Sequence, residues 1–236
     1  MLSRKVIKKI YADFENEGYG TVVRQGITKS DHELLDPFVS LVEFSVSPPG
    51  GFKDHPHRGR ITYSFFLHGG IIHQDCNGNK GTIHEGDVQW MTAGRGIIHS
   101  EMPEEQVNKG LQLWINLPSS AKMIEPKNLE ISSSEIPSAD DYGVEKAMKA
   151  FLAPRTLPQY KHIMLWCFGT GDEVSVWNTS SSRPLRFLLI AGEPIGEPVV
   201  QHGPFVMNSQ DEIEMTIGDY RNGMNGFEMA KHWRSE

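Results

Sequence analysis

Asp54-His55-Pro56-His57-Arg58-Gly59 places two histidines two positions apart, and Gly96-Ile97-Ile98-His99-Ser100-Glu101 places a glutamate two positions after a third histidine. Alternate residues of a β-strand point to the same face of a sheet. If neighbouring strands carry the two stretches, three imidazoles and one carboxylate point toward a common centre. That donor set suits non-haem iron or a similar divalent metal and leaves coordination positions open.

An isolated H-x-H pattern is more often a pair of polar surface residues than a pair of metal ligands. In this chain, however, six of the ten histidines lie between positions 55 and 99, which makes chance clustering a weaker explanation. We expect the other three histidines of this stretch to lie at the surface: His68, His73 and His84.

Length and composition limit the protein classes to consider. A chain of 236 residues can bury a sizeable core and fits one large domain or two small ones. The absence of an apolar run of about 18 residues argues against a membrane span, and residues 1–11 lack the apolar stretch of a signal peptide. Two cysteines, Cys76 and Cys167, favour a reducing compartment and leave a single bridge open. We therefore expect a soluble, intracellular protein.

The net charge of −7 argues against direct binding of nucleic acid, because such binding requires clustered basic residues. Short basic runs at Arg4-Lys5 and Lys8-Lys9 are more simply the solvated ends of an N-terminal strand. The charge therefore favours partners other than DNA or RNA.

Short apolar segments that alternate with turn signals predict an all-β barrel or sandwich in the first part of the chain. Residues 47–51, Ser-Pro-Pro-Gly-Gly, and the turn formers at residues 77–79 and 85–87 separate the segments. In the segment Leu111–Leu117 we expect the Trp114 side chain to pack in the core. The predicted strands are Thr21–Arg24, Val39–Val46, Ile61–Leu67, Ile71–His73, Gly81–Ile83, Val88–Met91 and Leu111–Leu117.

Thr92-Ala93-Gly94-Arg95-Gly96 precedes His99 directly and predicts a tight, exposed loop whose backbone approaches another group, although a plain turn fits equally well. The stretch is not a phosphate loop, because it lacks the lysine and the following helix. Arg58 and Arg95 either place positive charge at the mouth of the site or lie at the surface.

Four stretches carry a resemblance to the pirin family of the cupin superfamily: residues 54–59, 86–103, 110–117 and 201–208. The resemblance covers roughly residues 20–137 and 170–233. It implies an all-β bicupin, two jelly-roll barrels packed face to face, in which the N-terminal barrel binds iron.

By this resemblance the metal ligands are His55, His57, His99 and Glu101. These ligands leave a formal charge of +1 with Fe2+ and +2 with Fe3+, so the site can act as a redox switch. The same donor set also binds other divalent metals.

The resemblance implies two kinds of function. One is a metal-regulated transcriptional coregulator in the nucleus or cytoplasm that acts through protein partners, either transcription factors of the Rel type or a G-protein α subunit. The other is a quercetin 2,3-dioxygenase that opens a flavonol ring at the same iron, with Glu101 as a possible base. A vestigial, inactive site is the third alternative.

Three positions near the expected ligands depart from the family. Arg60 stands where pirins usually have an aromatic residue, and Ile61 and His68 stand where they usually have glutamates. Groups around the ligands tune metal affinity, so we expect these changes to affect activity more than binding.

The second half departs further from the family. About fifty residues of the family pattern are missing between positions 137 and 169, and a barrel that lacks so many strands cannot close and leaves strand edges exposed. We expect a second domain that is incomplete, partly disordered or rebuilt by contacts with a partner, and a defective gene product fits as well. We expect a metal-binding cupin domain over residues 1–137, an atypical linker over 138–168 with a helix at Gly143–Ala153, and a cupin remnant with a helical tail over 169–236. Two strands are expected in that remnant, Val174–Trp177 and Leu185–Ile190.

The tail carries the signals of a capped helix. Ser209 can cap its start, Ile213, Ile217 and Tyr220 recur at helical spacing, and Gly223 interrupts the pattern. We expect His202, just before this helix, to be structural and not a fifth ligand.

Overall fold

Short antiparallel strands form most of the N-terminal half of the chain. The computed structural model describes residues 2–136, 163–180, 182 and 187–236. Every strand predicted before residue 118 overlaps an observed strand, and the bounds differ by at most three residues. The observed elements of this half are β1 (Val6–Ala12), β2 (Phe14–Asn16), β3 (Thr21–Ile27), η1 (Lys29–Asp31), α1 (His32–Leu35), β4 (Phe38–Val46), β5 (Phe52–His57), β6 (Arg60–His68), β7 (Gly70–Asp75), β8 (Lys80–His84), β9 (Val88–Thr92), β10 (Ile97–Pro103), β11 (Asn108–Asn116), η2 (Ser119–Ala121) and β12 (Lys127–Ile131).

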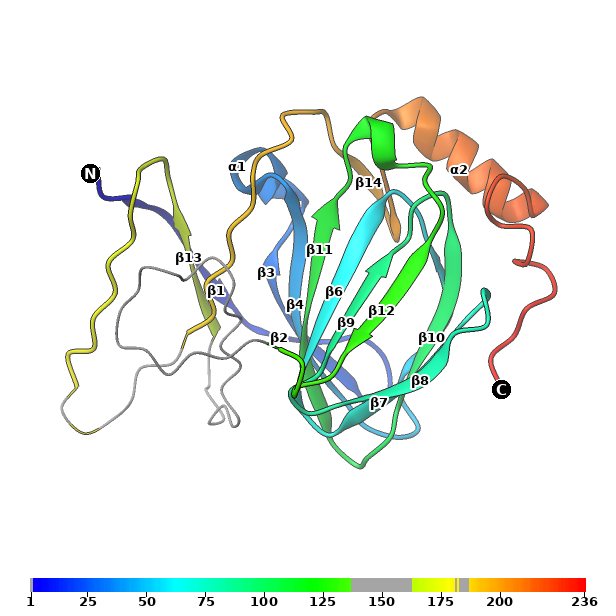
Figure 1. Cartoon of the computed structure of the whole chain (residues 1–236), viewed down its shortest axis with the longest axis horizontal. Coiled ribbons are helices and arrows are strands. Elements are labelled where there is room, and N and C mark those ends of the chain that lie inside the picture. The colour runs from blue at the N-terminus through cyan, green and yellow to red at the C-terminus, as the bar shows by residue number, and fades with distance from the viewer. Residues whose placement is uncertain (1, 137–162, 181, 183–186) are drawn as a thin grey trace.

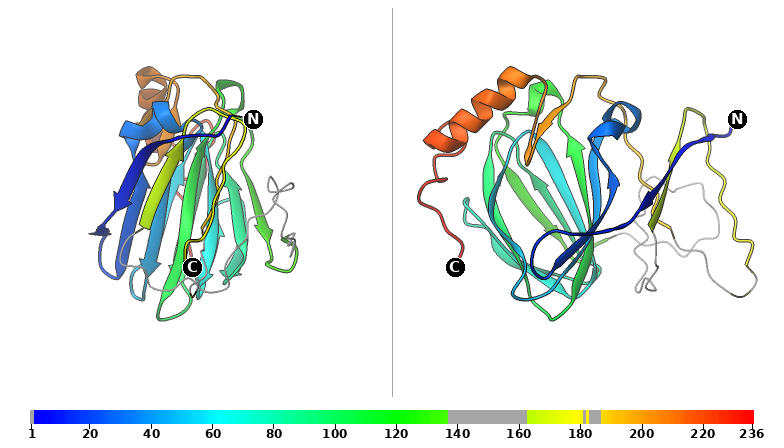
Figure 2. Two further views of the ribbon diagram at one scale, coloured as in Figure 1. Left: turned by 90° about the vertical axis from the view of Figure 1, so that its left-hand side faces the viewer. Right: turned by 180° about the vertical axis from the view of Figure 1, so that it is seen from behind.

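Two sheets face each other and together form a barrel (Figures 1 and 2). The larger sheet has seven strands in the order β12-β9-β6-β11-β4-β3-β2, and the smaller has four in the order β5-β10-β7-β8. This arrangement is the all-β barrel that the spacing of strands and turns predicts.

Strand β6 shows how the sequence covers both faces of the larger sheet. Because side chains alternate along a strand, Arg60, Thr62, Ser64 and Phe66 share one face, and Phe66 packs inside the barrel with residues of β7 and β8 such as Ile71 and Ile83. The alternate side chains join a second cluster on the opposite face: Tyr63, Phe65 and Leu67. Polar residues that share the face of Phe66 therefore point into the barrel.

The C-terminal part contributes β13 (Ile163–Phe168), β14 (Val200–His202), β15 (Phe205–Met207) and helix α2 (Gln210–Asn222). Strand β13 pairs antiparallel with β1, and β14 pairs with β15. Among the residues described after Ile136, these strands form two-stranded sheets and do not build a second closed barrel. Val174–Trp177, predicted as a strand, has no strand structure, and among the described residues no strand pairs with it.

Some predictions for this half remain untested. Residues 143–153, predicted as helical, lie outside the described residues, as do residues 185 and 186 of the other predicted strand; residues 187–190 of that strand are not in a sheet. The boundaries at 137 and 168 remain predictions.

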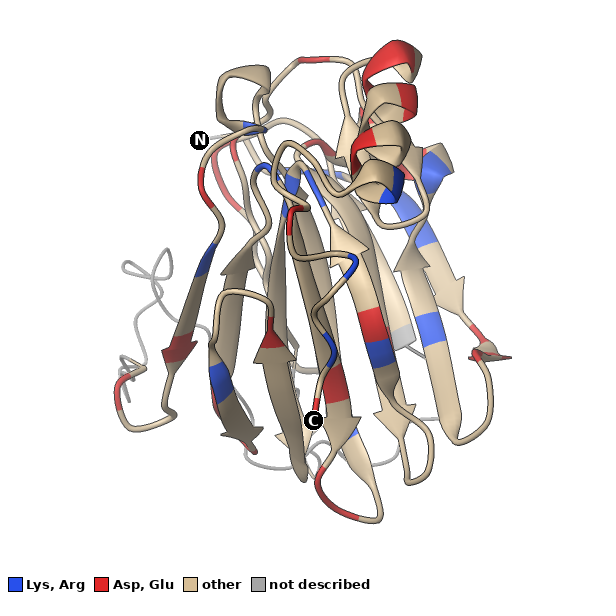
Figure 3. Cartoon of the chain, turned by 90° about the vertical axis from the view of Figure 1, so that its right-hand side faces the viewer, with Lys and Arg blue, Asp and Glu red and all other residues tan. Residues whose placement is uncertain are grey.

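Helix α2 begins and ends as its sequence predicts. Ser209 Oγ accepts a hydrogen bond from the Glu212 main-chain N–H, the Glu212 carboxylate accepts one from the Ser209 N–H, and Gly223 ends the helix with a φ of 69°. Acidic residues recur along the helix (Figure 3), and two of them, Asp211 and Glu214, are exposed. Its apolar side docks Ile213 against Phe205, Phe227 and residues of the barrel such as Ile98.

Both cysteines are free, Cys76 partly exposed and Cys167 buried, so the bridge left open by the sequence is not formed. No helix among the residues that the structure describes is long and apolar enough to cross a membrane.

Candidate metal centre

The pairing of β5 with β10 brings the histidines together. The two strands run antiparallel, and His99 lies directly opposite His55 in their register. His57 follows His55 by two residues and therefore points to the same side of the sheet. The spacing of the histidines in the two sequence stretches therefore brings their side chains to one side of the sheet, as predicted.

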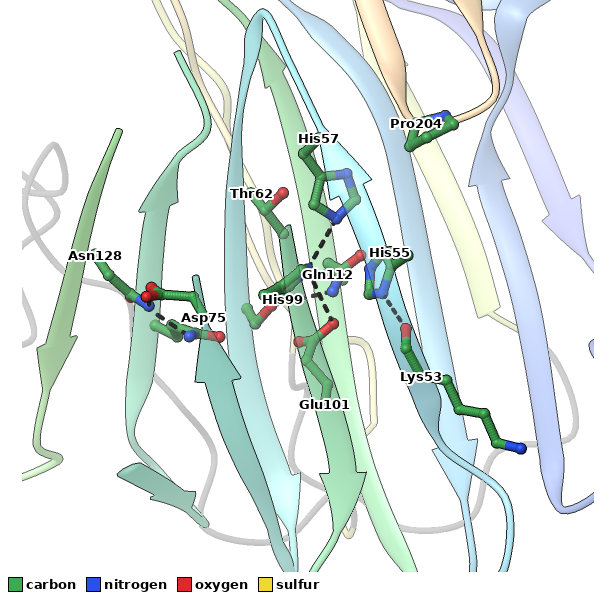
Figure 4. A network of polar contacts seen from close by, with 12 residues as sticks. Lys53, His55, His57, Thr62, Asp75, His99, Glu101, Gln112, Asn128 and Pro204 are labelled. Atoms are coloured by element: carbon green, nitrogen blue, oxygen red, sulfur yellow. Dashed lines mark hydrogen bonds and ion pairs between the residues drawn. The ribbon is translucent and has the colours of Figure 1, made fainter. Parts of the chain in front are cut away.

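The three imidazoles converge. One ring nitrogen from each of His55, His57 and His99 lies within 4.8 Å of the others, and His57 Nε2 is 2.9 Å from His99 Nε2 (Figure 4). Two nitrogen ligands bound at about 2.1 Å and at a right angle would lie about 3 Å apart. The positions of the nitrogens therefore fit a common divalent ion.

Glu101 lies beside this group. An irregularity in the pairing between His99 and Glu101 places Glu101 opposite Phe52, and its Oε2 is 3.9 Å from His99 Nε2. Burial raises the pKa of Glu101 to about 7, while the nearby charge of Arg60 and a hydrogen bond with Gln112 act in the opposite direction. The Glu101 carboxylate therefore lies next to the imidazoles. Its role as a fourth metal ligand remains a prediction.

The environment keeps the histidines neutral. Burial lowers the pKa of His55 to about 4, against the opposing effect of its bond with the Lys53 carbonyl, and lowers the pKa of His57 and His99 well below the usual range. The Nδ1–H of His55 donates to the Lys53 carbonyl oxygen at 2.7 Å, which leaves its Nε2 free. Neutral imidazoles supply the lone pairs that a metal requires.

Arg60 belongs to the site, although the sequence marks it only as a departure from the family. Its guanidinium lies 3.1 Å from the centre of the Trp114 ring, donates to Thr62 Oγ1 at 2.9 Å and contacts Nδ1 of His57. It also donates to the main-chain oxygen of Pro204 at 3.3 Å. The alternation of β6 indicates this inward position, because Arg60 shares a face with Phe66.

Arg58 and Arg95, the two arginines that the sequence places near the expected ligands, do not lie at the mouth of the site. Arg58 is buried and forms an ion pair with Asp219 of α2 at 2.8 Å. Arg95 is partly exposed and forms an ion pair with Glu125 at 3.0 Å. The loop around Arg95 is mostly buried, contrary to its predicted exposure, because Gly94 packs against the Ile124 main chain and Gly96 against Phe227.

One of the three histidines expected at the surface is buried. His73 is fully buried in β7, and its Nε2 lies 2.7 Å from a carboxylate oxygen of Glu130 on β12. His68 and His84 are exposed, as predicted. His202 is exposed in β14 and lies outside the group of three histidines.

Family models match both parts of the chain. The model described as Pirin matches residues 20–115, and the model described as Pirin C-terminal cupin domain matches residues 155–226. The chain belongs to the pirin family. Two cupin-type domains in one chain agree with the bicupin organisation that the resemblance implies.

Similar proteins cover nearly the whole of this pirin. Pirin-like protein 2 of Arabidopsis thaliana is 54% identical, over 100% of this chain and 89% of the relative, and Pirin of Homo sapiens is 41% identical, over 99% and 98%. The alignment with the Arabidopsis protein spans 287 positions, 51 more than the 236 residues of this chain. This chain therefore lacks residues that the relative has.

Among solved structures, a quercetin 2,3-dioxygenase from Acinetobacter baumannii superposes with a TM-score of 0.69 at 23% identity and covers 94% of this chain and 98% of its own. GK1651 from Geobacillus kaustophilus has a TM-score of 0.56 at 32% identity and covers 60% of this chain and 57% of its own. The first likeness shows that the two proteins share the fold.

Proposed function

We propose that this pirin binds one iron ion at His55, His57 and His99, with Glu101 as the fourth ligand, and acts as a redox-sensitive transcriptional coregulator. The observation that supports the proposal is the convergence of three neutral imidazoles within 4.8 Å. Iron bound by this set would change its charge by one unit on oxidation without a change of ligands.

The side chains inside the barrel favour metal binding over catalysis as the function of the site. A flavonol and oxygen both need room beside the ion, whereas Arg60 and Trp114 pack against His57 on the inner side of the barrel. His57, His99 and Glu101 are all buried. Three of the four proposed ligands are thus buried beside packed side chains, an environment that suits a resident ion better than a large substrate.

The charge of the surface supports partners that are proteins. The chain carries a net charge of −7, and acidic residues recur along α2 (Figure 3), where Asp211 and Glu214 are exposed. We propose that the protein acts in the nucleus or cytoplasm on a transcription factor of the Rel type or on a G-protein α subunit, the partners that the family resemblance suggests. Comparison of the Fe2+ and Fe3+ forms for binding to a purified Rel-type DNA-binding domain tests this part; equal binding by both forms would refute redox control.

Iron content tests the metal centre. The purified chain is loaded with Fe2+ without oxygen, desalted and analysed for iron per chain, together with His99→Ala and with His84→Ala as an exposed control. We expect about one ion in the wild type and in His84→Ala, and none in His99→Ala, because removing one ligand from a small set weakens binding strongly. Equal iron in all three proteins would contradict the proposal.

Oxygen uptake with quercetin on the same samples separates the two functions. The coregulator proposal predicts no uptake above that of the His99→Ala variant. Turnover that requires His99 would replace it with the dioxygenase.

A further inference from the structure

We propose that Lys122 is a positioning residue of the metal centre: its ammonium group joins the turn that follows His57 to strand β15 and thereby holds the His57 ring in place. The inference rests on the proposed function. It gives the C-terminal part of the chain, which carries β15, a role in metal binding.

The side chain of Lys122, directly after η2, is fully buried, which is unusual for a lysine. An ammonium group has three N–H donors, and a buried charge needs hydrogen-bond partners for them. Lys122 Nζ donates to the main-chain oxygens of Gly59 and Val206, each at 3.0 Å. It also donates to Asn116 Oδ1 at 2.7 Å. The three donors therefore join the turn between β5 and β6, the end of β11, and β15.

The ammonium group is charged at neutral pH. Burial lowers the pKa of Lys122 to about 8, and the carboxylates of Glu212 and Glu197 oppose this effect. At pH 7 the side chain is therefore mostly protonated, and all three N–H groups are present. An apolar side chain at this position would remove one donor from each of three buried oxygens.

Gly59 permits the close approach of β15. Its φ of 77° lies in the left-handed region, and a Cβ atom added to it would overlap the main-chain oxygen of Val206. The Val206 N–H in turn donates to the main-chain oxygen of Arg58 at 3.1 Å. Strand β15 therefore lies directly against the two residues that follow His57.

The turn between β14 and β15 contacts the His57 ring itself. The main-chain oxygen of Pro204 accepts hydrogen bonds from the His57 ring and from Arg60 Nε, the latter at 3.3 Å. Groups that contact a metal ligand from outside set its orientation and the affinity of the site. Because Pro204 and Val206 are separated by one residue, a shift of β15 would move this contact as well.

A second contact joins the same segment to the C-terminal part of the chain. The Glu197 carboxylate accepts hydrogen bonds from the Ser119 main-chain N–H at 2.6 Å and from Ser119 Oγ at 3.1 Å. It also accepts one from the Asn208 side chain at 3.0 Å. Residues 119–122 therefore contact the chain before β14 as well as β15, and Lys122 is the member of this segment that reaches the turn after His57.

Metal affinity tests the inference directly. Fe2+ is titrated without oxygen, in competition with a chelator of known affinity, into the wild type and Lys122→Met, which removes the three donors. We expect Kd to rise about 10-fold, the lower end of the range by which groups around the ligands alter metal affinity. An unchanged Kd in the folded variant would refute the role of Lys122.

A destabilised variant with an intact turn separates positioning from loss of stability. Ile83 is buried in a cluster with Phe44, Phe66 and Ile71 that contains none of the proposed ligands. Ile83→Ala leaves a cavity in this cluster and destabilises the fold, but it should bind Fe2+ with the Kd of the wild type. Equal weakening of Fe2+ binding in Ile83→Ala and Lys122→Met would contradict the inference.

Variants of Asn116 test the same contact if Lys122→Met does not fold. Asn116→Ala removes one of the three acceptors and should also weaken Fe2+ binding. Asn116→Asp keeps an oxygen for Lys122 and loses no hydrogen bond, because Asn116 Nδ2 has no partner among the described residues. This conservative variant should restore the affinity of the wild type. Wild-type affinity in Asn116→Ala would refute the inference.

Hydrogen exchange of the metal-free protein supplies a readout that does not depend on iron. In Lys122→Met the Val206 amide should exchange faster relative to the amides of β7, because β15 loses its contact with Lys122. In Ile83→Ala the Val206 amide should not be singled out in this way. An unchanged ratio in Lys122→Met would overturn the inference even if the affinity for Fe2+ falls.

The outcomes distinguish the two proposals. If Lys122→Met and Asn116→Ala bind Fe2+ as tightly as the wild type while His99→Ala abolishes binding, the role of Lys122 is refuted and the metal centre stands. If no protein binds Fe2+ through His99, both are refuted.

Discussion

Arg58 Nη1 lies 2.8 Å from Asp219 Oδ2, which joins the end of β5 to helix α2 across 161 positions of sequence. Arg58 also donates to the main-chain oxygens of Arg95 and Asn225, and its guanidinium lies 4.6 Å from the centre of the Phe227 ring. Because Arg58 follows His57 directly, these contacts hold the C-terminal helix beside the candidate metal centre.

Loss of Arg58 should therefore destabilise the protein. Arg58→Met leaves Asp219 and two main-chain oxygens without their donor, and we expect the free energy of unfolding to fall by about 3 kcal/mol. Urea denaturation measures this value. The exposed pair of Lys80 and Glu236 is the control, and Lys80→Met should change stability by less than about 1 kcal/mol. Equal effects of the two substitutions would contradict the central position of Arg58.

Removal of the N-cap of α2 should destabilise the protein less than the loss of Arg58. Ser209→Ala removes the oxygen that accepts from the Glu212 main-chain N–H, and we expect a loss of about 1 kcal/mol. Hydrogen exchange should become faster for amides in the first turn of α2, while Gln210→Ala at the neighbouring exposed position should leave exchange there nearly unchanged. Unaltered protection in Ser209→Ala would show that the cap contributes little.

The stability of the fold should depend measurably on pH because of Asp31. Burial raises the pKa of Asp31, but hydrogen bonds from Lys8 and Thr28 outweigh burial and hold the pKa below its ordinary value. A carboxyl whose pKa is lower in the folded state stabilises the fold above its unfolded pKa of about 3.9, and this contribution is lost as the pH falls through the folded value.

We expect Asp31→Asn to reduce stability by about 1 kcal/mol at pH 7, since Lys8 is partly exposed and solvent screens the pair. The difference between wild type and variant should shrink below about pH 4. Chemical denaturation at a series of pH values measures it. A difference that stays constant from pH 7 to pH 3 would contradict the assignment.

The spacing of the histidines predicts their convergence because alternation along a strand is a local property of the backbone. His55 and His57 share a side of β5, and the register with β10 then brings in His99. The start and end of α2 follow in the same way from Ser209 and Gly223.

Features that depend on distant partners are not predicted. The burial of His73 requires Glu130, 57 positions away, and no local pattern identifies that pair. The contact of Arg60 with His57 depends on the turn between β5 and β6 and on the ring of Trp114 across the sheet. An arginine inside a barrel contradicts its usual surface position, so sequence pattern alone favours the wrong environment.

The coordination shell of bound iron tests the central claim most directly. X-ray absorption at the iron edge of the Fe2+-loaded chain should show scattering from three imidazoles together with oxygen ligands, and the imidazole contribution should fall in His57→Ala. A shell of oxygen ligands without imidazole, or a spectrum that His57→Ala leaves unchanged, would contradict the assignment of the metal centre to His55, His57 and His99.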